Sequence, residues 1–356
     1  MSLPSFVQRQ LFPLYRHSLT KLHDLRYMFF ELTHRCNLAC RHCGSDCVRD
    51  TRTPDLPAED ILRVLKEIKD SGKDPSKITV ALSGGEPLCY PNLWELGRQI
   101  ARMGFPWGMV TNGFAWHDDS LAKALHAGMG SITLSLDGLK DDHDWLRGKE
   151  GSFERVMAAI DSLRDYTGNW DVITCVNERN IGDLEEIRAL LIDHGVKMWR
   201  FFMISPIGRA AKFPELTLSG PQLRRLFEKV IDFRNRGEID VCYSESGYLG
   251  SEFEQKVRSQ RYLCLAGIMI AGVMVNGDIL ACPNIDRRFA QGNIYRDSFI
   301  DVWENRYRQF RDRRWMRQGD CADCEHWTLC LGNSFHLWDL DQSRTRYCHC
   351  QRLKER

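Results

Sequence analysis

Short apolar runs alternate with longer amphipathic segments from residue 27 to about residue 235. Each apolar run has the length of a strand, and the segment after it carries apolar residues at helical spacing. This order is typical of repeated strand–helix units that form a parallel sheet. The predicted strands lie at residues 27–32, 78–82, 107–111, 132–136, 172–176 and 198–203. The predicted helices lie at 58–70, 93–103, 120–127, 153–163, 183–194 and 221–234.

The pattern changes after the last predicted helix. Residues 236–262 look like a linker, and cysteines become frequent beyond them. A single hydrophobic core rarely grows beyond about 250–300 residues, so a chain of 356 residues is expected to contain a large unit and a smaller one. We expect an N-terminal extension at 1–25, a strand–helix unit at 26–235, the linker, and a cysteine-rich module at 263–356.

The charge of the chain indicates no polyanionic partner. It has 49 basic and 48 acidic residues and a formal net charge of +1, so no overall field attracts nucleic acid or an anionic membrane. The first residues lack the apolar stretch of a signal peptide, and no run of about 18 apolar residues occurs. We expect a cytoplasmic protein without a nucleic-acid or membrane partner.

Three closely spaced cysteines follow the first predicted strand. Cys36, Cys40 and Cys43 occur in the run Cys-Asn-Leu-Ala-Cys-Arg-His-Cys, which lets three thiolates converge on one metal centre. A 4Fe–4S cluster usually takes four cysteines, so one iron would remain open to a ligand that is not protein. A zinc site would need a fourth Cys or His, and disulfides suit small secreted domains. Both alternatives fit this loop less well.

The loop resembles the cluster loop of the radical S-adenosylmethionine (SAM) enzymes, including an aromatic residue, His42, before the last cysteine. The resemblance implies that Cys36, Cys40 and Cys43 hold a 4Fe–4S cluster whose open iron binds SAM. It implies that an electron from the cluster cleaves SAM to methionine and a 5′-deoxyadenosyl radical. The implied fold is α/β, a partial (β/α)6 barrel resembling an incomplete TIM barrel. The family has no ligand at the place of Cys47, which is expected to be a free thiol.

The run Ser83-Gly-Gly-Glu-Pro87 follows the second predicted strand. Paired glycines there let the backbone approach a ligand closely and expose its peptide groups. In the family, this motif binds the amino group of SAM, so the resemblance implies contacts from Gly84, Gly85 and Glu86. An ordinary strand–helix turn is the alternative, but the position after a strand is the context that the motif requires.

Other strand ends carry further candidates for the SAM pocket. Ser135 and Arg147 resemble the family's serine and arginine at the ribose and carboxylate of the cofactor, and a guanidinium suits a carboxylate. The alternative for Arg147 is a solvated loop charge. Asn112, Asn177 and the backbone of residues 203–208 are expected to line the adenosyl pocket, although strand–helix turns collect Asn and Gly for steric reasons alone.

A second group of cysteines follows the strand–helix unit: Cys264, Cys282, Cys321, Cys324, Cys330, Cys348 and Cys350. Apolar runs on both sides of Asn276-Gly277 predict a β-hairpin with a type I′ turn that returns Cys282 towards Cys264. The spacing of the group resembles the SPASM domain, a small cysteine-rich C-terminal module that holds one or two auxiliary 4Fe–4S clusters. A zinc ribbon is the alternative for the later cysteines taken alone.

Ser334 stands where that family usually has a cysteine. One full ligand set is still available, with its last member left open: Cys321, Cys324, Cys330, and either Cys348 or Cys350. Cys264 and Cys282 would then recruit the spare cysteine and lack one thiolate. Ser334, Cys242, substrate or water would fill that place, or the second site is degenerate and empty.

Together these resemblances imply a radical SAM enzyme that abstracts a hydrogen from a peptide or protein, with auxiliary clusters assisting oxidation or cross-linking. One alternative is a radical enzyme acting on a small molecule in cofactor biosynthesis. Another is a non-catalytic iron–sulfur electron-transfer or scaffold protein. An external electron donor such as a flavodoxin or ferredoxin is expected. No catalytic residue is predicted, although Asp137 is the nearest candidate proton acceptor, with a turn-forming role as its alternative.

Overall fold

The computed structural model describes residues 5–245 and 247–355, with the backbone alone for residues 5–9. Its strands are β1 (Tyr27–Glu31), β2 (Thr79–Ser83), β3 (Trp107–Thr111), β4 (Met129–Ser135), β5 (Asn169–Val176), β6 (Met198–Met203), β7 (Asp240–Tyr243), β8 (Ile270–Val273), β9 (Asp278–Leu280), β10 (Gly292–Asn293), β11 (Trp338–Asp339) and β12 (Arg344–Thr345). Its helices are α1 (Ser5–Leu22), α2 (Ala58–Asp70), α3 (Leu93–Arg102), α4 (Ser120–His126), α5 (Lys140–Arg147), α6 (Ser152–Ser162), α7 (Leu184–Asp193), α8 (Gly220–Arg236), α9 (Gly250–Phe253), α10 (Phe299–Asn305), α11 (Arg308–Arg311), α12 (Trp327–Cys330) and α13 (His349–Arg352).

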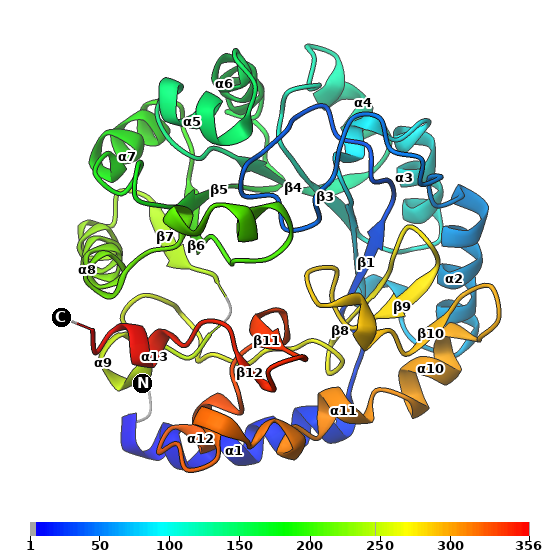
Figure 1. Cartoon of the computed structure of the whole chain (residues 1–356). Helices are drawn as coiled ribbons and strands as arrows, with labels where there is room; N and C mark the ends of the chain where they lie inside the picture. The colour runs from blue at the N-terminus through cyan, green and yellow to red at the C-terminus, as the bar shows by residue number, and fades with distance from the viewer. Residues whose placement is uncertain (1–4, 246, 356) are drawn as a thin grey trace.

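One curved sheet runs through the described chain in the order β10-β9-β8-β1-β2-β3-β4-β5-β6-β7. The strands from β8 through β1 to β7 are parallel to their neighbours, and helices α2 to α8 cover the outer face of the curve (Figure 1). This arrangement confirms the predicted α/β partial barrel. The carboxyl ends of its parallel strands meet at one edge, where such barrels place their chemistry.

The six predicted strands correspond to β1–β6, but the sheet continues beyond them. β7 lies within residues 236–262, so the expected linker contains a strand, and also the short helix α9. β8, from the cysteine-rich module, pairs in parallel with β1. The two modules therefore share one sheet. The sequence predicted only a linker between them.

Local signals in the sequence set the limits of the longer helices. α8 begins with a capping box, in which Ser219 and Gln222 each bind the other's backbone N–H, and it ends at Gly237 with a positive φ of 68°. α2 has Glu59 and Asp60 in its first turn, where carboxylates interact favourably with the helix dipole.

The alternation of residues along the strands divides the barrel wall into two faces. In β5, Val172 and Val176 are fully buried and belong to the hydrophobic core. Asp171 points the other way, accepts a hydrogen bond from the Thr133 hydroxyl at 2.6 Å and forms an ion pair with Arg200. At this level the inner face is therefore polar, and its charges are paired across neighbouring strands.

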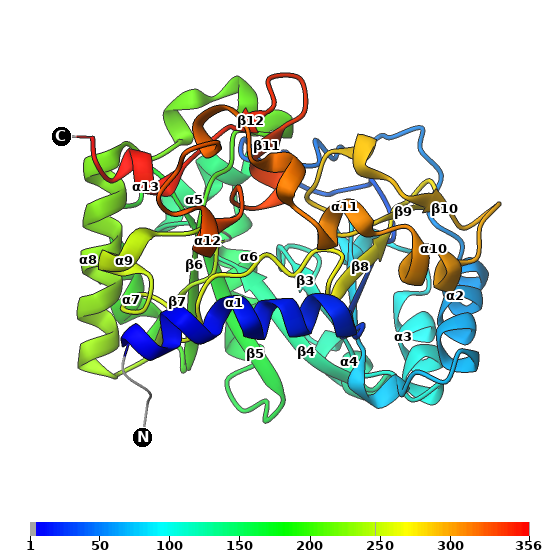
Figure 2. The ribbon, with the colours of Figure 1, turned by 90° about the horizontal axis from the view of Figure 1, so that it is seen from below.

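Helix α1 was not predicted; the sequence indicated only an extension there. It carries Pro13 within its length and lies along the C-terminal module, beside α12 (Figure 2). Arg16 Nη1 donates to the Thr328 carbonyl at 2.8 Å. None of the helices in the described ranges is long and apolar enough to cross a membrane.

The predicted hairpin between Cys264 and Cys282 forms, with β8 and β9 antiparallel, but its turn type was wrong. A type I′ turn needs positive φ at both central residues, whereas here only Gly277 has one, of 84°. Asn276 binds the Asp278 N–H through its side chain at 3.1 Å, and the Gly277 N–H donates to the Met274 carbonyl at 2.8 Å. Gly277 alone takes the left-handed conformation.

We predict that Gly97→Ala destabilises the barrel. A Cβ at Gly97 would lie 2.2 Å from Cζ2 of Trp107, whose fully buried ring is fixed by a 3.0 Å hydrogen bond from Nε1 to the Ala127 carbonyl. Overpacking costs up to about 3 kcal/mol, and a 2.2 Å clash with a fixed ring belongs at the upper end of that range. This exceeds the roughly 1 kcal/mol that alanine gains over glycine in a helix. Circular dichroism should show a thermal midpoint lower by about 3 °C or more.

The matched control is Gly182→Ala, whose added Cβ meets nothing within 4 Å and whose φ is not positive. Its midpoint should stay within about 2 °C of the parent. Equal midpoints for the two variants would contradict the packing argument.

Candidate functional site

The loop of residues 32–57 joins β1 to α2 without a helix or strand of its own, and it crosses the mouth of the barrel (Figure 1). It brings Cys36, Cys40 and Cys43 into one buried group, together with Cys47 and Leu38. Cys40 and Cys43 are close enough to Cys36 to disfavour its thiolate, and burial is the larger cause that raises the Cys36 pKa to about 12. Such a thiol releases its proton when it binds a metal.

The turn after β2 holds one side of this loop. The Gly85 N–H donates to the Thr33 carbonyl at 2.7 Å, and the Glu86 N–H donates to the Arg35 carbonyl at 3.0 Å. The approach is so close that a Cβ at Gly85 would lie 2.2 Å from the Arg35 oxygen. The glycine motif therefore docks the cysteine loop against the strand end.

Two other segments hold the opposite side of the loop. At the end of α5, the carbonyls of Arg147 and Leu146 accept hydrogen bonds from the backbone N–H groups of Ala39 and Arg41, at 3.2 and 2.8 Å. After β6, Arg209 donates to the carbonyls of Cys40 and Cys47, at 2.7 and 2.6 Å. Sequence reasoning missed Arg209, which follows directly on the 203–208 stretch that it had singled out.

Arg147 is buried beside the cysteines, which excludes the solvated loop charge. Its Nη2 lies 2.6 Å from Asp137 Oδ2, and its Nη1 lies 3.8 Å from Cys40 Sγ. Burial disfavours the Asp137 carboxylate, but the positive charge of Arg147, helped by a backbone hydrogen bond, outweighs that effect, and the pKa of Asp137 is below the ordinary value. The Cys175 N–H also donates to Asp137 at 2.8 Å. Asp137 is thus an ion-paired group that orients its neighbours.

A cluster of potential ligands surrounds this ion pair. His42, Asp137 and Cys175 place donor atoms within 4.8 Å of one another. Burial lowers the pKa of His42 to about 4, so its ring is neutral. The sequence offered no signal for Cys175 beyond its place at the end of a strand.

Glu86 and Asn112 connect two strand ends to the loop. The fully buried Glu86 carboxylate accepts hydrogen bonds from the Thr111 hydroxyl at 2.6 Å and from the Asn112 N–H at 2.9 Å. Burial raises its pKa. The Asn112 side chain donates to Asn37 Oδ1 at 2.8 Å and lies 3.9 Å from Cys36 Sγ. Both residues lie close to Cys36, and their contacts with SAM remain predictions.

Ser135 and Asn177 lie at the ends of β4 and β5, and both are buried. The side-chain oxygen of Asn177 accepts from the Arg179 N–H at 3.0 Å, and its amide donates to the Cys175 carbonyl at 3.3 Å. A local turn therefore uses the polar atoms of Asn177. Contacts of Ser135 and Asn177 with a cofactor remain predictions.

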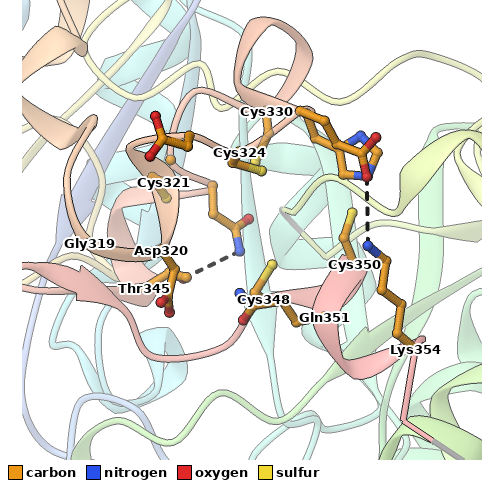
Figure 3. A pocket seen from close by; sticks show the side chains of 15 residues that line it. Gly319, Asp320, Cys321, Cys324, Cys330, Thr345, Cys348, Cys350, Gln351 and Lys354 are labelled. Carbon is orange, nitrogen blue, oxygen red and sulfur yellow. Dashed lines mark hydrogen bonds and ion pairs between the residues drawn. The ribbon is translucent and has the colours of Figure 1, made fainter.

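Five later cysteines surround one cavity of about 480 Å³ (Figure 3): Cys321, Cys324, Cys330, Cys348 and Cys350. We call this group the cysteine bowl. Burial is the main cause that raises the pKa of Cys321 to about 11 and of Cys330 to about 12, and Cys348 adds to both shifts. The Cys350 thiol instead donates to the Tyr248 carbonyl at 3.2 Å. Both members of the last pair thus belong to the same bowl.

Cys264 and Cys282 form a separate pair that does not line the bowl. Arg313 is buried next to them, and its guanidinium donates to the carbonyls of Cys264 and Asn333, at 2.7 and 3.2 Å. Ser334 is fully buried there as well. The structure therefore brings neither Cys348 nor Cys350 over to this pair as a spare ligand.

The donor chemistry fits iron–sulfur clusters better than zinc. All fourteen cysteines are free. Zinc ligands at about 2.3 Å from the metal lie close together, but within residues 5–245 and 247–355 the single group of three donors spaced for one ion contains only one cysteine. Both cysteine groups are more widely spaced, and sulfur is the usual ligand of 4Fe–4S clusters.

Two family models match the chain: the radical SAM superfamily over residues 30–191, and SPASM, an iron–sulfur cluster-binding domain, over residues 264–325. The chain belongs to the radical SAM superfamily and carries a SPASM domain. It is an enzyme, and these domains imply 4Fe–4S clusters and SAM as its cofactors. The resemblance noted in the sequence is thereby confirmed.

Among the relatives is the mycofactocin maturase MftC of Mycolicibacterium smegmatis, which is 30% identical over 312 residues, 85% of this chain and 76% of that protein. The AdoMet-dependent heme synthase of Methanosarcina barkeri is 26% identical over 324 residues, 86% of this chain and 90% of that protein. In fold, the chain is similar to SuiB of Streptococcus suis bound to S-adenosylmethionine, with a TM-score of 0.72 and 18% identity over 98% of this chain and 84% of that chain.

We predict that Gly85→Ala prevents the cysteine loop from docking. The added Cβ would collide with the Arg35 carbonyl, next to Cys36, and both partners are backbone atoms that cannot rotate away. After anaerobic reconstitution, iron analysis should show a loss of about 4 irons per chain. The control is Gly44→Ala in the same loop, whose Cβ would meet only the Ile207 side chain at 3.4 Å. Full iron content in the Gly85 variant would refute the docking argument.

Proposed function

We propose that this protein is a maturase that abstracts a hydrogen atom from a peptide or protein side chain. When bound, the cluster and SAM supply the 5′-deoxyadenosyl radical for that step. The observation that carries the proposal is the convergence of Cys36, Cys40 and Cys43 at the mouth of the barrel, beside the Gly85 turn. The identity to a protein named a maturase supports the substrate class.

In this proposal, the residues around the loop hold the cofactor in place. Cys36, Cys40 and Cys43 are the cluster ligands, and Arg147 adds a positive charge beside Cys40. Gly84 and Gly85 offer backbone carbonyl oxygens as acceptors for the amino group of SAM. Ser135 and Asn177, which are buried at strand ends, line the adenosyl pocket. Asn112 and Glu86, which are hydrogen-bonded to each other, lie beside the same pocket.

The inner face of the barrel offers the substrate wall. Three side chains on this inner face are half-buried: Cys175 on β5, Phe202 on β6 and Cys242 on β7. The side chains on the outer face of the same strands are mostly fully buried. All three side chains lie near the carboxyl ends of their strands, at the edge of the sheet where the cysteine loop lies. A peptide side chain placed against them would reach the cofactor and be shielded from water.

Within the SPASM domain we propose one complete auxiliary cluster in the cysteine bowl. Cys348 and Cys350 both lie near the other cysteines of the bowl, but the Cys350 thiol is hydrogen-bonded to the Tyr248 carbonyl. The ligands of the proposed auxiliary cluster are therefore Cys321, Cys324, Cys330 and Cys348. Cys264 and Cys282, with Ser334 in place of a third thiolate, are the basis of a second, incomplete site.

The second candidate is a radical enzyme that acts on a small molecule. It is favoured by the match to a heme synthase along 90% of that protein. The two candidates differ in what accelerates SAM cleavage. Stimulation of 5′-deoxyadenosine formation by a porphyrin, and not by peptides, would favour the small-molecule enzyme.

We predict that the reconstituted protein forms 5′-deoxyadenosine from SAM after addition of dithionite. Cys40→Ser removes a cluster ligand and should abolish the product and about 4 irons per chain. Cys47→Ser, in the same loop, should keep both if Cys47 is not a ligand. Chromatography of the quenched reaction and iron analysis provide the measurements. If the parent protein forms no 5′-deoxyadenosine, the electron-transfer or scaffold hypothesis replaces this one.

The bowl yields a separate prediction. Cys348→Ala should lose about 4 irons per chain and the electron paramagnetic resonance signal of one reduced cluster, because a thiolate is removed from a closed set of four. Cys350→Ala should retain both. The reverse result would exchange the roles of these two cysteines, and equal losses would indicate that both are needed.

A further inference from the structure

A groove rich in basic side chains separates α1 from the segment that follows α10. Its cavity has a volume of about 640 Å³. The basic side chains that line it come from α1 and from residues 308–314, and we call it the basic groove: Arg16, Lys21, Arg308, Arg311, Arg313 and Arg314. Figure 2 shows α1 along the outer side of the C-terminal module, with α11 beside it.

Most of this positive charge has no counter-ion. Two acidic residues line the groove, and both are occupied: Glu304 pairs with His23 and Lys73, and Asp312 pairs with Arg314. Within the described chain, five basic groups have no ion pair: Arg16, Lys21, Arg308, Arg311 and Arg313. The terminal and internal residues outside the described ranges include no Asp or Glu.

Several of these charges are also held away from water. Arg313 is only 4% exposed, and Arg311 donates to the carbonyls of Gly267 and Glu304, both at 3.0 Å. Burial, together with repulsion from Arg313, lowers the pKa of Arg16. Backbone carbonyls and aromatic rings hold Arg311 and Arg313 in place. No carboxylate of the described residues neutralises these charges, so the groove keeps a positive potential that attracts negative charge.

The groove also borders both groups of auxiliary cysteines. Leu263 and Leu331 line it, and they are the chain neighbours of Cys264 and Cys330. Arg313, on its wall, binds the Cys264 carbonyl at 2.7 Å. A partner in the groove would therefore lie within a few side chains of the auxiliary cluster.

We propose that the basic groove docks an acidic one-electron carrier protein, of the flavin or iron–sulfur class, that reduces the auxiliary cluster. One electron leaves the reduced carrier and enters the oxidised cluster, and no bond is made or broken. A substrate peptide is the less suitable occupant, because the groove lies at the auxiliary cysteines and the substrate must reach the Cys36 loop. This inference rests on the proposed function only in requiring a cluster in the cysteine bowl.

The test uses the reconstituted full chain and a bacterial flavodoxin. Lys21→Glu combined with Arg308→Glu reverses two exposed charges in the groove. Lys197→Glu combined with Arg225→Glu reverses two exposed charges outside it and changes the net charge equally. Calorimetry gives the Kd for oxidised flavodoxin, and stopped-flow absorbance gives the rate of cluster reduction by its reduced form. Reduced methyl viologen, a small cation, serves as the second reductant.

The groove variant should bind flavodoxin at least about tenfold more weakly at low salt and be reduced by it about tenfold more slowly. Its salt dependence should flatten, while reduction by methyl viologen stays equal or becomes faster. The control variant should match the parent in both measurements.

Equal Kd values for the groove and control variants would overturn the proposal. So would an effect confined to the KM of a peptide substrate, because the groove would then be a peptide site. A protein that forms no 5′-deoxyadenosine but retains groove-dependent flavodoxin binding and cluster reduction would refute the proposed function and leave this inference standing.

Discussion

The loop that carries Cys36, Cys40 and Cys43 has no helix or strand to fix it, and the rest of the site depends on how it is held. Ordering each residue of such a segment costs about 1–2 kcal/mol of conformational entropy, and three sulfurs alone leave most of the backbone free. Hydrogen bonds from the β2 turn, the end of α5 and Arg209 supply the missing constraints. Since these segments are far apart in the sequence, the loop reaches its conformation only when the barrel has formed.

The same contacts determine the electrostatics of the loop. Arg147 and Arg209 place two guanidinium groups beside the thiols of the loop, where Asp137 pairs with Arg147 and Asp46 pairs with Arg209. In a buried site, charges interact more strongly than in water. Groups of this kind around metal ligands orient the ligands and tune the metal. The residues that hold the loop in place would therefore also favour the thiolate form that the proposed cluster requires.

Periodicity predicted the strands and helices of the barrel because long amphipathic helices and buried strands give clear signals. The predicted limits of α2, β3 and β6 agree with the structure at every residue. α5 was missed since it is short and mostly polar, and β7 since four residues carry little pattern. β8 was predicted as one arm of a hairpin, but its pairing with β1 was not. The grouping of Cys36, Cys40 and Cys43 followed from their spacing. The ion pair of Arg147 with Asp137 and the hydrogen bonds of Arg209 to the cysteine loop depend on which strand ends become neighbours in space. Local sequence patterns do not contain that information.

The shared sheet explains how the two groups of cysteines are kept at a fixed separation. β1 leads directly into the Cys36 loop, and its parallel partner β8 lies between Cys264 and Cys282 in the chain, with Tyr27 opposite Ile270. Glu31, at the end of β1, also accepts the Val275 N–H at 3.1 Å and pairs with Arg287. A rotation of the SPASM domain would break this ladder and expose a buried carboxylate. Residues 236–262 are therefore a connection in the sequence only, and the hydrogen bonds between β1 and β8 join the modules into one body.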